Sequence, residues 1–336
     1  MKKNEVRLTS AEIANIWNTY IYDSMMESVI THFKLTTADE EVGVLLEEGL
    51  KVVQNHLQSL EELFSKEGIA KPDGFPVDKH VNRQAPKLFS DTFYLEYLNQ
   101  MSQFKITSHA TSIVMASRDD IHQLYKQFSE DATQLNKRVR TVMKNQGIYI
   151  RPPYMAYPKQ VDYVEKQSFL TGWLGRRRPL LAAEAAYLVM NSINNEIAKA
   201  TLIGFAQVAK DPEIRSFFLR GQKVCSEIMT SIFEVLQEDN IPASMTWDTV
   251  VNESTVAPYS ERLMLFLVTS LSGLGIGMYG QAMALSLRRD VAALYASFIG
   301  KAGAYAEDGV NLMIERGWLE QPPHFLDRER LVVESK

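Results

Sequence analysis

The sequence predicts an all-α protein built from two tandem four-helix bundles. Apolar residues recur three and four positions apart through most of the chain, which is the spacing of one face of an α-helix, and strand-like alternation is scarce. The chain also resembles itself at a nearly fixed offset, which indicates a duplication. In each copy, one long link separates two pairs of helices. These three observations together predict the fold.

An internal repeat is visible in the two segments that start at Arg118 and Arg288. They read RDDIHQLYKQF and RRDVAALYASF, at an offset of 288 − 118 = 170 residues. Upstream the offset is 184 − 12 = 172 residues, because Glu12 aligns with Glu184. The two-residue difference falls in a loop, where insertions cost little stability. We therefore expect a first bundle at 8–158, a linker at 159–178 and a second bundle at 179–327.

Four long helices are expected in each copy, and local signals mark their ends. Ser90 and Ser260 precede the third helices, where a serine can accept a hydrogen bond from the first turn. Gly147 and Gly317 follow the fourth helices, where glycine commonly ends a helix. In the first copy the predicted helices span 9–34, 39–67, 90–116 and 119–146. In the second copy they span 180–208, 211–239, 260–287 and 289–316.

The lengths of the links predict how the helices are arranged. The links between the first and second helices, and between the third and fourth, are short, so each of these pairs should be antiparallel neighbours. The link between the second and third helices is long, about twenty residues, in both copies. A long crossover at this point is typical of ferritin-like bundles. The predicted architecture is therefore two tandem ferritin-like four-helix bundles.

Composition indicates which kinds of binding partner and which cellular compartment to expect. The chain has 336 residues and a net charge of −5, which gives no basic footprint for nucleic acid. The lysines near the N-terminus are not followed by an apolar core, so we expect no signal peptide. The one cysteine, Cys225, lies in an amphipathic run and is expected to be a buried thiol in a reducing compartment. These features predict a cytoplasmic protein.

One segment, 263–287, carries no charge over twenty-five residues and is long enough to cross a bilayer. The repeat provides a control, because its counterpart at 93–117 contains Glu96, Lys105 and His109. That counterpart is an ordinary amphipathic helix. A helix that is apolar all round is usually buried all round. We therefore predict a buried helix and no membrane span.

Small residues in the second copy suggest close helix packing. Gly273 and Gly277 are expected where another backbone approaches the apolar helix, and alanines and glycines recur in the first and fourth helices of this copy. On this basis the second copy should be the tighter bundle. The outer face of the apolar helix should be covered by the first copy or by a second subunit.

A four-helix bundle with this crossover raises the possibility of a metal site. Di-iron carboxylate bundles use Glu-x-x-His on two helices, and none of the six histidines has glutamate three residues before it. A reduced site for zinc, iron or manganese remains possible inside copy one, whereas copy two has Lys199, Ile228 and Tyr279 at three of the matching positions. The alternative is a hydrogen-bonded core histidine with a glutamate at the solvated edge. The candidate metal ligands are Asp23, Glu27, His56 and His109.

Several motifs carry a family resemblance that extends from about residue 8 to residue 327. The chain resembles a family from spore-forming bacteria, the domain of unknown function number 3231. The resemblance implies a duplicated ferritin-like bundle, distantly akin to the spore coat protein F group, and it supplies no catalytic residues. The motifs are LFSDTF (88–93), RPPYMAYP (151–158), KQSFLTGWLGRRRPL (166–180), MTWD (245–248), RRDVAALY (288–295) and YAEDGVNLMIERGWLEQPP (305–323).

Three hypotheses for function follow. The first is a non-catalytic helical protein that acts by association, as a homo-oligomer or with another protein. Its role would be in sporulation or stress, in the cytoplasm or associated with the spore. The second is a metal-binding bundle that uses copy one, and any enzymatic activity would then be a metal-dependent oxidoreductase. The third is a small-molecule binder, for which the more polar interior of copy one is the expected location.

Overall fold

A computed structural model describes residues 6–173, 177–242 and 248–328, and the regular elements in these ranges are helices. Two isolated β-bridges are the other regular pairings there. The first copy contains α1 (Ser10–Thr36), α2 (Glu40–Glu67), α3 (Val77–His80), α4 (Asp91–Met115) and α5 (Asp119–Asn145). The second contains α6 (Ala182–Val208), α7 (Pro212–Glu238), α8 (Glu261–Ala284) and α9 (Arg289–Glu315), with 3₁₀ turns η1 (Gln167–Leu170) and η2 (Asp248–Val250) outside the bundles. The predicted all-α fold with two repeats is confirmed.

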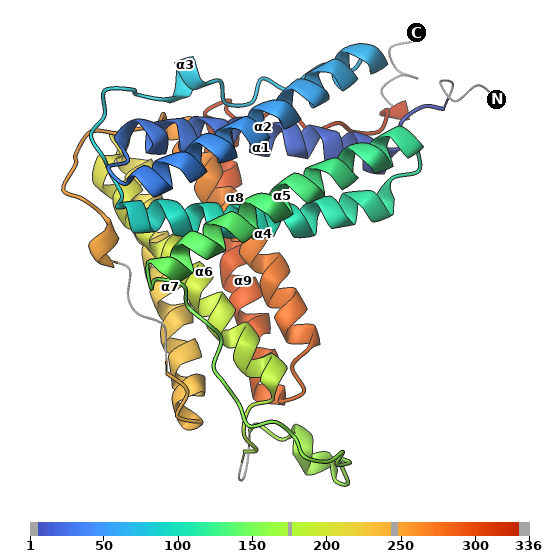
Figure 1. Ribbon diagram of the computed structural model, residues 1–336, viewed down its shortest axis with the longest axis vertical. Helices are drawn as coiled ribbons and strands as arrows, with labels where there is room; N and C mark the ends of the chain where they lie inside the picture. The colour runs from blue at the N-terminus through green and yellow to red at the C-terminus, as the bar shows by residue number, and fades with distance from the viewer. Residues whose placement is uncertain (1–5, 174–176, 243–247, 329–336) are drawn as a thin grey trace.

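Each copy brings its four long helices together. In the first copy α1 contacts α2 and α4, and α5 contacts α2 and α4. In the second copy α6 contacts α7 and α8, and α9 contacts α7 and α8. In the view of Figure 1 the helices of the first copy run across the picture, and those of the second copy run down it beneath them. The chain between the copies loops out at the far end of the second copy.

A buried glutamate joins the first helix of each copy to the fourth. Glu12 Oε1 accepts the backbone N–H of Arg118 at 2.8 Å, and Glu184 Oε1 accepts that of Arg288 at 2.8 Å. The first N–H groups of a helix lack partners within the helix, and a carboxylate is favoured there. Burial alone would raise the pKa of Glu12, but these hydrogen bonds outweigh it and lower the pKa to about 2. The same connection in both copies supports the duplication.

The two long crossovers hold the copies together. Val81 pairs with Tyr259 and Phe89 pairs with Val251 in antiparallel bridges. The Phe89 ring also packs against α6, where a Cβ on Gly204 would lie only 2.5 Å from it. Glycine is therefore required at that position because an aromatic ring of the first copy lies against the backbone of the second.

The apolar segment forms α8, and the first copy covers part of it. Among the described helices, α8 has the length and composition that could cross a membrane, and 39% of its most apolar stretch is buried. Its N-terminal half is in the core, and Phe266 lies 5.9 Å from the Tyr22 ring and 4.8 Å from the Phe75 ring. This half of the helix is therefore interior to the protein, as expected.

The C-terminal half of α8 differs from the prediction. A Cβ placed on Gly273 or Gly277 would meet nothing within 4 Å, so no other backbone approaches either glycine. The same holds for Gly300 and Gly303 in α9. At these four positions the small residues leave space instead of allowing a close backbone contact. The tighter second bundle stays a prediction.

Candidate ligand-binding site

A cluster of buried titratable side chains lies inside the first copy. Asp23 of α1, His56 of α2, Lys105 and His109 of α4 are all buried, and Asp131 of α5 closes the cluster from the surface. These residues lie near the middle of their helices, where the apolar stripes of the four helices face one another. Three of the four predicted ligands are therefore brought together.

His56 lies between two carboxylates. Its Nδ1 is 3.3 Å from Asp23 Oδ2, and its Nε2 is 3.2 Å from Asp131 Oδ2. Its ring stacks on Phe128 with the centroids 3.8 Å apart. Because a carboxylate only accepts hydrogen bonds, Nε2 donates to Asp131. His56 Nδ1 and Asp23 Oδ2 face each other but make no hydrogen bond in the described residues, so His56 lies between two carboxylates and is hydrogen-bonded to one of them.

Asp23 also pairs directly with Lys105, whose ammonium group contacts Asp23 Oδ1. Burial alone would raise the pKa of the Asp23 carboxyl, but Lys105 and His56 outweigh it and lower the pKa to about 2. A buried carboxylate is tolerated when opposite charges and hydrogen bonds compensate its lost hydration. The Asp23–Lys105 pair therefore fills the middle of the first bundle.

His109 differs from the other members of the cluster because it makes no hydrogen bond or ion pair within the described residues. Its ring is 2% exposed, and neither ring nitrogen has a hydrogen-bond partner in the described part of the chain. Burial, followed by the positive charge of Lys105, lowers the pKa of His109 to about 3. His109 is therefore a neutral imidazole with an unused donor and an unused acceptor.

Glu27 does not join the cluster. It is partly exposed, and its Oε1 accepts a hydrogen bond from Gln54 Nε2 at 3.0 Å. Within residues 6–173, 177–242 and 248–328, no three His, Cys, Asp or Glu side chains are arranged to hold a metal ion. The ammonium of Lys105 also occupies the carboxylate that a metal would need. The arrangement favours internal ion pairing, and metal binding by Asp23, His56 and His109 stays a prediction.

Sequence reasoning missed the two partners that complete the cluster. Lys105 was recognised only as a polar residue of the third helix, although it lies four residues before His109 and therefore on the same helical face. Asp131 lies on α5, and 75 residues separate it from His56. A lysine on the same helical face as His109 was the available signal for a buried ion pair.

In the second copy the positions equivalent to Asp23, Lys105 and His109 are uncharged. Applying the two offsets, Asp23 corresponds to Asn195, Lys105 to Gly275, and His109 to Tyr279. Asn195 Nδ2 donates to the Tyr279 hydroxyl at 2.8 Å, and both residues are buried. Glycine has no side chain to occupy the space that lysine fills in the first copy.

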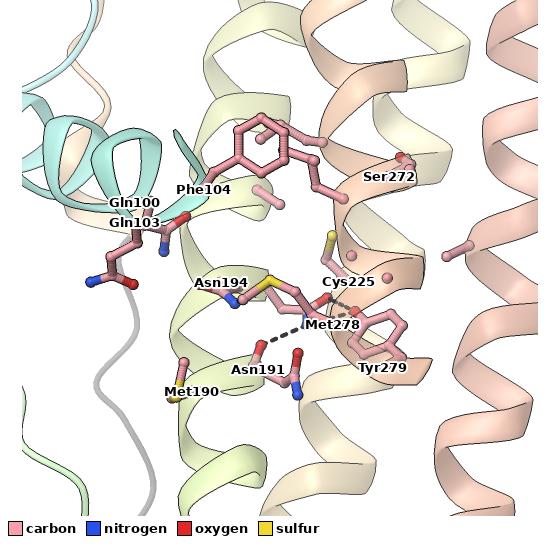
Figure 2. Close-up of a pocket in the computed structure, with 18 of the residues that line it drawn as sticks. Gln100, Gln103, Phe104, Met190, Asn191, Asn194, Cys225, Ser272, Met278 and Tyr279 are labelled. Atoms are coloured by element: carbon pink, nitrogen blue, oxygen red, sulfur yellow. Dashed lines mark hydrogen bonds between the residues drawn. The ribbon is translucent and has the colours of Figure 1, made fainter. Parts of the chain in front are cut away.

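A cavity of about 740 Å³ lies beside Gly275, between α6, α7 and α8. Figure 2 shows Asn194 of α6 and Met278 and Tyr279 of α8 at this space, with Phe104 of α4 at its upper end. The wall of the cavity therefore includes α4 from the first copy as well as helices of the second copy. Most of this lining belongs to the second copy, whereas we expected a ligand site in the more polar interior of the first copy. The location of a bound ligand stays a prediction.

The lining of this cavity is mostly apolar with a few amide groups. Asn194 Nδ2 lies 3.1 Å from Met278 Sδ, and Gln100 and Gln103 lie at the edge contributed by α4. Cys225 also lines the cavity, and burial raises the pKa of its thiol to about 12. The thiol is thus protonated at neutral pH and is unsuited to act as a nucleophile.

Comparison with known proteins gives a family for the chain. The family described as Protein of unknown function (DUF3231) matches residues 1–161 and 168–331. The chain belongs to this family. The two matched segments agree with the duplication, so one DUF3231 unit corresponds to one four-helix copy.

One solved structure is similar to part of this DUF3231 protein. It is described as a "putative spore coat protein" from Bacillus halodurans, with 20% sequence identity and a TM-score of 0.41. The alignment covers 46% of this chain and 100% of the other. No curated protein matches the sequence.

Proposed function

We propose that this protein binds a small, mostly apolar molecule in the cavity between α6, α7 and α8. The observation that carries the proposal is the cavity itself, about 740 Å³ with an apolar lining and a few amides. Ligand sites in proteins are commonly of this size and have this composition. Binding there would bury the apolar surface of the ligand without displacing core side chains.

The position of Gly275 supports a ligand site over a packing defect. A glycine in a helix interior costs about 1 kcal/mol relative to alanine. A Cβ at this position would have only an ordinary contact, 3.7 Å from the Tyr279 ring, so packing does not require glycine. The residue keeps the cavity open at a cost in helix stability, which is expected where space serves binding.

The experiment is a fluorescence titration with N-phenyl-1-naphthylamine, an uncharged apolar probe. The wild-type protein should bind it saturably, and Gly275→Leu should weaken binding at least tenfold because the leucine fills the cavity. Gly280→Leu is the matched control, because Gly280 is on the same helix, has nothing within 4 Å of its Cβ position and does not line the cavity. Equal binding by all three proteins would contradict the proposal.

Association of two molecules of this chain is a second candidate function, and exposed tyrosines between α5 and α6 favour it. Tyr154, Tyr157 and Tyr163 are 84%, 90% and 87% exposed. Exposed aromatic side chains in one segment are typical of interaction surfaces. Light scattering should give a dimer mass for wild type and a monomer mass when all three tyrosines are replaced by serine. A monomeric wild-type protein would exclude self-association.

A further inference from the structure

The cavity between α6, α7 and α8 has a lining with polar groups but without charge. Among the described residues that line it, there is no Asp, Glu, Lys, Arg or His side chain. A charged group buried in this space would lose its hydration without an opposite charge to compensate it. The lining therefore favours an uncharged ligand. Its amide side chains are those of Asn15, Gln100, Gln103, Asn191, Asn194, Asn195 and Gln281.

Three asparagines of α6 line this space, and they differ in what their amide N–H groups contact. Asn191 Nδ2 donates to the Tyr187 carbonyl oxygen at 2.9 Å, and Asn195 Nδ2 donates to the Asn191 carbonyl oxygen at 2.7 Å. Asn194 Nδ2 instead contacts Met278 Sδ at 3.1 Å. A thioether sulfur is a weak hydrogen-bond acceptor. Of the three amides, that of Asn194 therefore gains most from a new oxygen acceptor.

The contact between Asn194 and Met278 can open without disturbing the core. Asn194 is only partly buried, and Figure 2 shows its amide and the Met278 side chain together at the cavity. Methionine is unbranched and flexible, so its side chain can move aside when a ligand enters. An oxygen atom of the ligand then takes the place of the sulfur atom next to Asn194 Nδ2.

The first copy shows that the fold does not need an amide at this position. At the upstream offset Asn194 corresponds to Tyr22, because 194 − 172 = 22. The Tyr22 ring packs against the rings of Phe104 and Phe266, and the centroids are 5.9 Å apart in both pairs. An aromatic side chain thus fills this position in the first copy. In the second copy the shorter asparagine leaves room and presents a hydrogen-bond donor to it.

We propose that the ligand of this cavity is an uncharged apolar molecule with a carbonyl oxygen, to which Asn194 Nδ2 donates a hydrogen bond. Met278 gives up its contact with Asn194 and packs against the apolar part of the ligand. This inference rests on the proposed function, because it names the class of ligand for the same site. Asn194 is the residue that determines the specificity of the cavity.

The test is displacement of N-phenyl-1-naphthylamine by 2-decanone and by 2-methyl-1-decene. The two molecules have the same shape, but only the ketone has an oxygen acceptor. Asn194→Leu should weaken binding of the ketone by about three- to tenfold, which is the effect of one hydrogen bond. The alkene should bind to Asn194→Leu at least as tightly as to wild type, because it has no hydrogen bond to lose.

Asn194→Asp gives a second readout, which a merely structural role would not change. Aspartate keeps the shape of asparagine, but its carboxylate only accepts hydrogen bonds. This variant should bind 2-decanone more weakly than wild type does, and it should bind decylamine more tightly, because the ammonium group meets an opposite charge. Asn55→Asp is the control, because it adds the same charge at an exposed position of α2 that does not line the cavity. It should behave as wild type.

Charged ligands of similar length test the uncharged class in the wild-type protein. Decanoate and decylamine are both charged at pH 7, with opposite signs. Each should bind at least tenfold more weakly than 2-decanone, because the lining offers neither charge a partner.

The outcomes separate this inference from the proposed function. If the probe binds saturably but Asn194→Leu affects the ketone and the alkene equally, the carbonyl assignment is overturned and the cavity is still a binding site. Equal wild-type affinity for 2-decanone, decanoate and decylamine, or a bound probe that 2-decanone does not displace, likewise overturns this inference alone. Failure of the probe and of all four ligands to bind overturns both. A loss in Asn194→Leu that is confined to the ketone supports both.

Discussion

Lys105 of α4 and Gly275 of α8 occupy equivalent positions in the two copies, and only the lysine fills the space in front of it. In the first copy the lysine pairs with Asp23. In the second copy Asn195 takes the place of the aspartate, and the cavity opens beside the glycine. Two pairs of equivalent positions thus distinguish an interior that holds an ion pair from one that opens into a cavity.

Restoring the ion pair in the second copy should close the cavity. We predict that Asn195→Asp combined with Gly275→Lys abolishes binding of N-phenyl-1-naphthylamine. The double variant should be more stable than Gly275→Lys alone by about 1–3 kcal/mol, because the single variant places an unpaired charge in the bundle. Urea unfolding of the two variants measures this difference. Equal stability would show that the two side chains do not meet.

Replacing His109 and replacing His56 with leucine should change the free energy of unfolding in opposite directions. His109→Leu should raise the free energy of unfolding by about 1–3 kcal/mol, because it removes a buried polar group without partners. His56→Leu should lower it by about 3–5 kcal/mol, because it removes the histidine that lies between two carboxylates. Both values come from urea unfolding at pH 7. Destabilisation by both changes would mean that His109 has a partner.

Removal of one member of the Asp23–Lys105 pair should cost more than removal of both. Asp23→Leu leaves a buried ammonium group and should lower the free energy of unfolding by about 3–5 kcal/mol. Asp23→Leu combined with Lys105→Met replaces the pair with apolar groups and should recover most of that loss. Additive losses in the double variant would contradict the pairing.

Glu96 should make stability depend on pH near neutrality. It is 4% exposed, and burial raises its pKa from 4.5 to about 7, although Asn99 and Gln100 lower it in part. Its contribution is complete below pH 4.5 and is lost as the pH rises through 7, because the unfolded chain releases the proton first. Glu96→Gln should therefore gain about 3 kcal/mol relative to wild type between pH 4 and pH 8. A constant difference across that range would contradict the raised pKa.

The helices could be predicted because their signals are local. Ser90 and Ser260 accept hydrogen bonds from the backbone N–H groups of Phe93 and Leu263, at 3.3 and 3.2 Å, as N-cap serines do. The repeat adds a second, independent observation of each element. Both kinds of information depend on residues that are near one another in sequence or at a fixed offset.

The cavity could not be predicted, because the relevant signals have two meanings. A glycine such as Gly273 is expected both where a neighbour is very close and where no neighbour is present, and the sequence does not distinguish these cases. The burial of Lys105 depends on Asp23, which is 82 residues away. Phe104 of the first copy lines the cavity of the second copy. This placement depends on how the two copies pack, which no local sequence pattern encodes.

The measurement that tests the central claim most directly is a crystal structure of the protein soaked with N-phenyl-1-naphthylamine. We predict density for the probe between α6 and α8, against the Tyr279 ring and beside Gly275. Density at another place, or a structure in which α8 packs onto α6 and closes the cavity, would contradict the account.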